Sequence, residues 1–107
     1  MDKHGYVYIM ANAPMGTLYI GSTTDIVGRV WQHKNHEYPK SFTAKYNCNM
    51  LVYYEQHSNM DTMVLRERQL KKWNRNWKMR LIIQHNPDWY DLYPMLLEAY
   101  GYDSNLE

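Results

Sequence analysis

The chain has 107 residues, a length that fits one domain and leaves little room for a second. A chain of this size buries roughly two-thirds of its unfolded surface, which is enough for a stable core without staples. Its single cysteine, Cys48, excludes an intramolecular disulfide and indicates a reducing cytoplasm. No apolar run approaches the roughly 18 residues of a membrane span, and no signal-peptide core follows the first residues.

Charge is unevenly distributed along the chain, although the net charge is only +1. Seven of the twelve Lys and Arg residues lie between positions 66 and 80, where Glu67 is the only acid, whereas residues 88–107 carry five acids and no Lys or Arg. A basic face beside an acidic tail fits polyanion binding, and the plainer interpretation is a solvated helix face. The residues expected to contact nucleic acid are Arg66, Arg68, Lys71, Lys72, Arg75 and Lys78.

The first elements expected are two short strands. Residues 6–10 and 18–21 are β-prone, and the segment 11–17 between them contains Asn, Pro and Gly. They predict an antiparallel hairpin with a longer-than-minimal turn. Alternation along the first strand separates two faces, one carrying Tyr6, Tyr8 and Met10 and the other Val7 and Ile9.

A helix is expected next, over about residues 25–34, where Ile26 and Val30 are one turn apart. Arg29 and His33 are also four residues apart, so we expect them on one rim of this helix. Asp25 favours a first helical turn. The hydroxyls expected to cap the helix belong to Ser22, Thr23 and Thr24.

One strand and several helices are expected in the second half of the chain. They are a short helix near 41–46 within the loop 35–50, a strand at 51–55, helices at about 60–73 and 77–85, and a helical turn or two at each of 88–93 and 94–100. Ser58 or Asn59 is expected to cap the first long helix, and the segment 74–76 to interrupt it.

The element order β-β-α-β-α-α indicates an α+β domain, a small three-stranded antiparallel sheet flanked by helices. We expect residues 1–93 to form this domain and 94–107 an acidic extension, either part of the same unit or a tail.

Glu67 lies on an apolar stripe of the first long helix. The stripe consists of Met60, Met63, Val64, Leu70 and Trp77. A carboxylate in such a position is costly unless a metal ion, an arginine or an open cleft compensates it. A purely structural ion pair with Arg29 is the plainer alternative.

Four motifs at suitable spacing carry a family resemblance. They are Tyr6-Val7-Tyr8, Tyr19-Ile20-Gly21, Arg29 followed by His33, and the stretch 66–73 around Glu67. Together they resemble the GIY-YIG endonuclease superfamily over about residues 5–93, in particular a small single-domain branch of uncharacterised bacterial proteins. Tyr6 stands at the leading glycine position of the first motif, a departure shared by that branch. An asparagine that some members carry has no clear counterpart near position 78.

The resemblance implies a role for each matched position. Tyr8 and Tyr19 correspond to the two motif tyrosines, and Tyr19 is similar to the general base for the attacking water. Arg29 resembles the phosphate-facing arginine, and His33 the residue that assists with water or phosphate. Glu67 resembles the single carboxylate that anchors Mg²⁺ or Mn²⁺. The implied substrate is DNA, with RNA left open.

The same residue types suit phosphodiester hydrolysis on chemical grounds. The reaction needs a deprotonated nucleophile and neutralisation of the charge that grows on the phosphate oxygens. Arg29 can supply two parallel donors. One carboxylate, Glu67, is enough to anchor an Mg²⁺ ion that keeps waters and shares phosphate oxygens. A tyrosine base, with an ordinary pKa of about 10, requires a nearby cation or metal-bound water.

We therefore predict a divalent-metal-dependent DNA endonuclease in the cytoplasm, structure-selective in DNA repair or recombination. No appended DNA-binding domain is visible, so specificity is expected from nucleic-acid shape or a protein partner. The alternatives are a non-catalytic nucleic-acid-binding module and a protein-interaction domain. Trp73 and Trp77 are expected as core anchors rather than base-stacking platforms. The remaining candidates give no zinc spacing and no thiol nucleophile: His4, His36, His57, His85 and Cys48.

Overall fold

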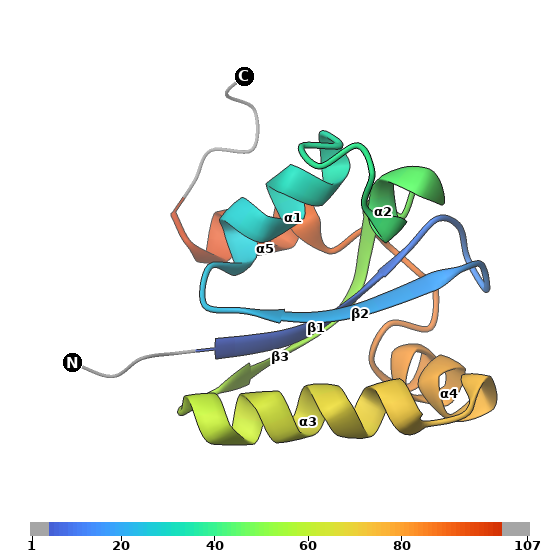
Figure 1. The fold of residues 1–107 in the computed structure, drawn as a ribbon, viewed down its shortest axis with the longest axis vertical. Coiled ribbons are helices and arrows are strands. Elements are labelled where there is room, and N and C mark those ends of the chain that lie inside the picture. Colours follow the sequence, from blue (N-terminus) through green and yellow to red (C-terminus); the bar gives the residue numbers. More distant parts are fainter. Residues whose placement is uncertain (1–4, 102–107) are drawn as a thin grey trace.

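A three-stranded antiparallel sheet with helices on both faces forms the centre of the computed structural model, which describes residues 5–101 (Figure 1). The strands are β1 (Gly5–Ala11), β2 (Leu18–Thr23) and β3 (Met50–His57). Their order is β2-β1-β3, so the first strand is central and both neighbours pair with it antiparallel. This confirms the predicted α+β fold, and each strand extends one or two residues beyond its predicted bounds.

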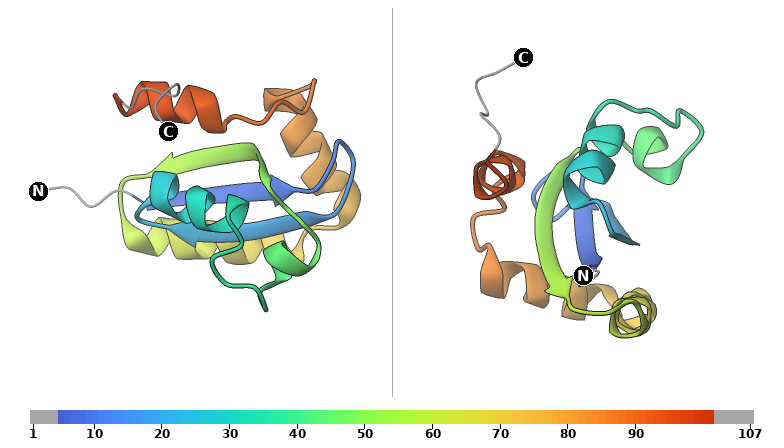
Figure 2. Two further views of the ribbon diagram at one scale, coloured as in Figure 1. Left: turned by 90° about the horizontal axis from the view of Figure 1, so that it is seen from above. Right: turned by 90° about the vertical axis from the view of Figure 1, so that its left-hand side faces the viewer.

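Helices cover the two faces in pairs. The helices are α1 (Ile26–Lys34), α2 (Phe42–Lys45), α3 (Met60–Lys72), α4 (Arg75–His85) and α5 (Tyr93–Ala99). Helices α1 and α5 lie above the sheet in Figure 1, and α3 and α4 lie below it. Seen from above, α1 crosses β1 and β2, while α5 runs beside β3 (Figure 2). No helix within residues 5–101 is long and apolar enough to cross a membrane.

Strand β1 is buried on both faces, and its alternating side chains enter two separate cores. Val7 and Ile9 pack with the residues of α3 and α4, whereas Tyr6, Tyr8 and Met10 pack with those of α1 and α5. This is the alternation predicted from the sequence. Each fully buried large side chain contributes about 1.5–3 kcal/mol relative to exposure, so the central strand holds the two layers together.

The start of α1 differs from the prediction. Asp25 is the N-cap, and its side chain accepts a hydrogen bond from the backbone N–H of Gly28 at 3.0 Å. Thr23 instead accepts from the backbone N–H of Asp25 at 3.0 Å. The side chain of Ser22 lies on the face of β2 opposite to that of Thr23, because neighbouring residues of a strand alternate between faces. The Ser22 hydroxyl therefore does not cap α1 and can form a hydrogen bond on the other face.

Helix α3 ends at Lys72, and the chain changes direction at Trp73. Asn74 caps the new helix α4 by accepting from the backbone N–H of Trp77 at 3.0 Å. Trp77 thus belongs to a different helix from Glu67, and the stripe predicted to join them is wrong at this point. Trp77 is 49% exposed, so its predicted role as a core anchor is also wrong. Trp73 does pack against the core below the sheet.

The stripe on α3 itself is narrower than predicted. Met63 and Leu70 are buried, whereas Met60 and Val64 are exposed. Asn59 caps this helix, accepting from the backbone N–H of Thr62 at 2.9 Å.

The C-terminal segment packs onto the α1 side of the sheet. No helical turn forms at 88–92, where Trp89 has a positive φ of 56° and is buried. Helix α5 follows, and its Leu96 is buried in the same core as Tyr8. Residues 94–101 therefore lie against the domain. Residues 102–107, which complete the predicted acidic extension, and residues 1–4, which include His4, lie outside the described residues.

Candidate active site

Strand β2 forms an edge of the sheet, with α1 over one face and α3 against the other. Pairing places Tyr19 opposite Met10 and Gly21 opposite Tyr8. Paired residues point to the same face, so Tyr19 and Gly21 lie on the α1 side. Ser22 follows on the α3 side. We call this edge of β2, with Tyr19, Gly21 and Ser22, the rim. Side chains from the helices on both faces of the sheet can reach it.

Three rings gather on the α1 side of this rim. The ring of Tyr19 lies 6.3 Å from that of Tyr8 and 5.3 Å from that of His33, between centroids. The hydroxyl of Tyr8 is 2.8 Å from Nε2 of His33. A Cβ added at Gly21 would stand 2.6 Å from the Tyr8 hydroxyl oxygen. The glycine of the Tyr19-Ile20-Gly21 motif therefore provides the space that this hydroxyl occupies.

His33 is buried and has a partner for each ring nitrogen. Its Nδ1 lies 2.8 Å from Oγ1 of Thr43, and its Nε2 contacts Tyr8. Burial and the neighbouring charge of Arg29 lower the pKa of His33 to about 4. The imidazole is therefore neutral near neutral pH. It can exchange hydrogen bonds but carries no charge for a phosphate.

Tyr8 is also buried, and its phenol stays protonated. Burial raises the pKa of Tyr8 well above its ordinary value, and the neighbouring Tyr19 and Glu67 raise it further against the opposing effect of Arg29. A phenol of this kind cannot serve as a base near neutral pH. Tyr19 is partly exposed, and it is the motif tyrosine that a water and a phosphate could reach.

Arg29 opens onto a pocket of about 130 Å³ on the α1 side. The pocket is lined by Tyr19, Arg29, Gln32, His33, Tyr38, Ser41, Phe42 and Thr43. Within residues 5–101 the guanidinium makes no hydrogen bond or ion pair with another side chain. Its positive charge nevertheless acts to lower the pKa values of both Tyr8 and His33. It is therefore placed beside Tyr19 with its donors available for an anion.

Glu67 approaches the rim from α3. The hydroxyl of Ser22 donates to its Oε1, and Nζ of Lys71 lies 2.7 Å from its Oε2. Burial raises the pKa of Glu67, but the hydrogen bonds from Lys71 and Ser22 and the charge of Arg68 outweigh it, so the net shift is downward. The side chain is 20% exposed. Glu67 is thus ionised near neutral pH and open to water, and its cationic partner is Lys71 rather than the Arg29 considered from the sequence.

The donors around Glu67 suit one kind of metal site. No cluster of three or more His, Cys, Asp or Glu side chains able to hold a metal occurs in the described range 5–101. A closed site of four protein ligands is therefore a poor fit. A single ionised carboxylate with a hydroxyl beside it fits an Mg²⁺ or Mn²⁺ ion that keeps most of its waters and is completed by a phosphate.

The predicted basic residues divide into two groups. Lys71 and Lys78 line a concavity of about 280 Å³ together with Tyr19, next to the rim of β2. Arg68 is exposed and acts on Glu67 through its charge, and Lys72 is exposed on the same helix. The structure therefore brings Lys71 and Lys78 to the site.

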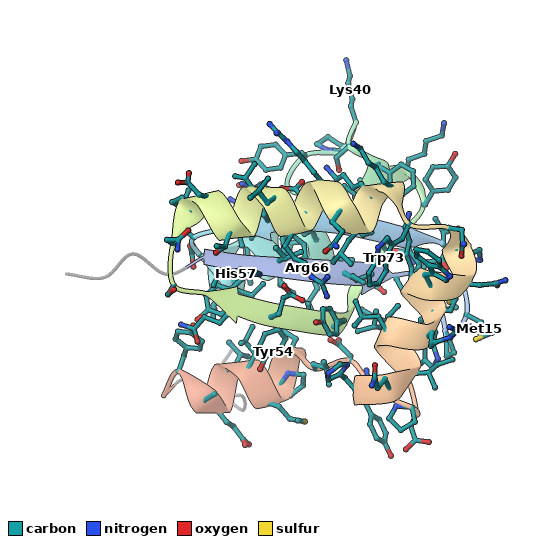
Figure 3. All side chains as sticks on the ribbon, turned by 90° about the horizontal axis from the view of Figure 1, so that it is seen from below. Met15, Lys40, Tyr54, His57, Arg66 and Trp73 are labelled. Carbon is teal, nitrogen blue, oxygen red and sulfur yellow. The ribbon has the colours of Figure 1, made fainter. Side chains whose placement is uncertain are left out.

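Arg66 and Arg75 are engaged elsewhere. Nε of Arg66 donates to both carboxylate oxygens of Glu55 at 3.2 and 3.1 Å, and its guanidinium lies 5.2 Å from the ring centroid of Trp73. Figure 3 shows Arg66 between α3 and β3, on the underside of the sheet. Arg75 donates to the carbonyl oxygens of Met15 and Gly16 at 2.6 Å each. Arg66 thus joins α3 to β3, and Arg75 joins α4 to the loop before β2.

Several interacting residues were missed from the sequence. Thr43 gives no local signal, because a threonine in a short helix such as α2 is ordinary. Lys71 was predicted as a DNA contact but not as the partner of Glu67, a pairing that could have been found because a lysine four residues after a glutamate on a helix is a favourable pair. Alternation along β3 could have indicated the network in which Glu55 accepts from Tyr53 at 2.6 Å and pairs with His57 at 2.5 Å.

Comparison with known proteins identifies the class. Residues 4–80 match the family model described as the GIY-YIG catalytic domain. The chain therefore belongs to the GIY-YIG family, a family of nucleases that generally use divalent metals.

Within that class, the relatives are small proteins. The chain is 35% identical over 88 residues to a UPF0213 protein of Syntrophus aciditrophicus, covering 82% of this chain and 98% of the relative. It is 35% identical over 82 residues to a UPF0213 protein of Staphylococcus saprophyticus, covering 77% and 96%. These relatives confirm the predicted small single-domain branch.

A solved structure agrees with the fold. The solution NMR structure of a UPF0213 protein from Bacillus halodurans matches with a TM-score of 0.53 at 22% identity, covering 86% of this chain and 96% of that chain. At this identity the likeness bears on the fold alone.

Proposed function

We propose that this protein is a divalent-metal-dependent endonuclease that hydrolyses phosphodiester bonds in DNA. The observation that carries the proposal is the convergence at the rim of β2. There Tyr19 lies beside the unpaired guanidinium of Arg29 on one side, and the ionised carboxylate of Glu67 approaches from the other. The charges of Arg29 and Glu67 both act on the single hydroxyl of Tyr8, which supports their closeness.

Each residue has a distinct proposed role. Arg29 donates through two parallel N–H groups to the two non-bridging oxygens of the scissile phosphate and so orients the scissile bond. Tyr19 acts as the base in its phenolate form, in which its oxygen accepts the proton of the attacking water and becomes a neutral phenol. Tyr8 and His33 are hydrogen-bonded to each other and are both uncharged. The pocket wall that they form therefore does not neutralise the positive charge of Arg29, which remains available to the substrate phosphate.

Glu67 is the proposed anchor of Mg²⁺ or Mn²⁺. When bound, such an ion supplies positive charge for the phosphate oxygens and lowers the pKa of a coordinated water. Ser22 fixes the carboxylate by donating to Oε1. The lowered pKa of Glu67 keeps the carboxylate ready to bind a cation near neutral pH.

DNA affinity is proposed to come from three cations at the site: Lys71 and Lys78, which line the concavity beside Tyr19, and Arg68, whose charge acts on Glu67. Contacts of this kind with phosphates are sequence-independent and weaken with salt. Specificity is therefore proposed to rest on nucleic-acid shape or on a protein partner, as in a structure-selective role in DNA repair or recombination. A cytoplasmic location is proposed from the single cysteine, which is free and buried.

A plasmid-nicking assay tests the proposal. With Mg²⁺ or Mn²⁺ the wild type converts supercoiled plasmid to nicked plasmid, and a chelator stops it. Glu67→Gln and Arg29→Ala each reduce nicking about 100-fold or more, a loss typical of removing a group that stabilises a transition state. Glu98→Gln and Arg80→Ala are matched controls that remove exposed charges from α5 and α4. Circular dichroism verifies that all variants fold. Wild-type nicking by either site variant would refute the assignment.

A non-catalytic nucleic-acid-binding module is the second candidate. It is favoured by one observation, that both carboxylate oxygens of Glu67 already have protein partners. This candidate gains if the protein binds DNA in a salt-dependent manner, no metal supports nicking, and Glu67→Gln binds DNA at least as tightly as the wild type.

A further inference from the structure

The resting state of Glu67 leaves no carboxylate oxygen without a protein partner. Oε1 accepts from Ser22, and Oε2 lies 2.7 Å from Nζ of Lys71. A divalent ion that binds this carboxylate must therefore share an oxygen with a donor already present or displace it.

Lys71 is the partner that is more easily displaced. Its side chain is 53% exposed, whereas the side chain of Glu67 is 20% exposed. An exposed ion pair at this helical spacing changes an equilibrium constant by a factor of only about two. Ser22 has a short side chain on a paired residue of β2. Its hydroxyl oxygen keeps lone pairs for a cation while its O–H continues to donate to Oε1 of Glu67.

The ammonium of Lys71 has a second possible position, in the concavity next to the rim of β2. Lys71 lines the concavity that also contains Tyr19 and Lys78. Lys78 makes one long contact there, 3.5 Å from Nζ to the backbone oxygen of Lys71. A phosphate in this concavity would lie beside Tyr19 and between two lysine side chains, a favourable position for an anion.

We propose that Lys71 occupies the place of the divalent ion on Glu67 in the free protein and turns to the substrate phosphate when the ion binds. Lys71 and the ion thus compete for Oε2 of Glu67, and each ion that binds frees one ammonium for DNA. This inference rests on the proposed function, because it takes Glu67 as the metal anchor.

Binding of Mn²⁺ without DNA tests the competition directly. The measurement is paramagnetic broadening of the backbone amide signals around Glu67 during a Mn²⁺ titration. Lys71→Met keeps the length of the side chain and removes the competing charge, so Mn²⁺ should bind at least about twofold tighter than to the wild type. Lys72→Met, which removes an exposed charge from the next position of α3, is the matched control and should leave the Mn²⁺ affinity unchanged. Equal Mn²⁺ affinities of the Lys71 and Lys72 variants would overturn the proposal.

DNA binding in the presence of a chelator tests the second half. Glu67→Gln removes the ion pair and frees Lys71, so it should raise the affinity for a short DNA duplex. That gain should persist in a Lys72→Met background and be reduced in a Lys71→Met background. An equal gain in the two backgrounds would mean that Lys71 does not reach the phosphate.

The outcomes separate this inference from the proposed function. If Glu67→Gln leaves Mn²⁺ binding intact, the metal anchor is elsewhere, and both proposals fail. If Glu67→Gln abolishes Mn²⁺ binding but Lys71→Met matches the Lys72 control, the anchor stands and only the exchange of Lys71 is refuted.

Discussion

Lowering the pH should destabilise this protein through the buried side chain of His33. His33 has 8% of its surface exposed, and its two ring nitrogens contact Tyr8 and Thr43. Burial and the charge of Arg29 lower its pKa from 6.5 to about 4. The unfolded chain therefore binds more protons at this position between these two values. The stability that His33 contributes is complete above the unfolded pKa and is lost as the pH falls toward the folded pKa.

The size of the effect follows from the difference between the two pKa values. One pKa unit corresponds to about 1.4 kcal/mol, so the full difference corresponds to about 3 kcal/mol. Between about pH 7 and about pH 5 the loss from His33 should be about 2 kcal/mol. Glu55 and Glu67 have pKa values below their ordinary 4.5, so their contribution is lost only at lower pH.

Urea unfolding at a series of pH values measures this loss. His33→Gln keeps hydrogen-bonding groups near Tyr8 and Thr43 but cannot titrate, so its stability should depend less on pH by about 2 kcal/mol over the same interval. The difference between the two proteins isolates His33 from every other titrating group. If wild type and variant lose stability equally between about pH 7 and about pH 5, His33 is not held neutral in the folded state and the reasoning is wrong.

Three other substitutions test the rim and its surroundings. Gly21→Ala places a Cβ 2.6 Å from the buried Tyr8 hydroxyl oxygen; urea unfolding should show a loss of about 1–3 kcal/mol, and an unchanged stability would mean that Tyr8 can move aside. Lys78→Ala should lower the slope of log DNA affinity against log salt by about one, as expected for one lost phosphate contact. Arg66→Ala should instead cost about 1–3 kcal/mol of stability, because it leaves Glu55 without its cation; a salt slope reduced as much as in the Lys78 variant would place Arg66 on the DNA.

The sequence determined the elements and the side of each element on which a residue lies. Alternation in β1 separated Tyr8 from Val7 and Ile9, and the structure keeps them in separate cores. Helical spacing put Arg29 and His33 one turn apart. These features depend on the backbone repeat of a strand or helix, which acts over a few residues and can be read directly from the chain.

Only the tertiary structure decided which side chains meet. The seven cations between positions 66 and 80 look alike in the sequence. Arg66 is nevertheless held by Glu55 and Arg75 by the loop before β2, whereas Lys71 and Lys78 line the concavity that also contains Tyr19. Arg66 and Lys71 belong to the same helix, α3, but point to different sides of it. The change of direction after Lys72 then brings Lys78 of α4 to the same concavity as Lys71.

The partners of Glu67 and His33 were decided in the same way. Ser22 looked like a helix cap in the sequence, and Thr43 had no distinguishing feature. Ser22 meets Glu67 because β2 lies beside α3, and Thr43 meets His33 because the chain after α1 folds back and places α2 next to that helix. Local periodicity fixes the face that a side chain occupies on its own element. The element that covers that face is fixed by packing between segments far apart in the chain, and no local pattern records it.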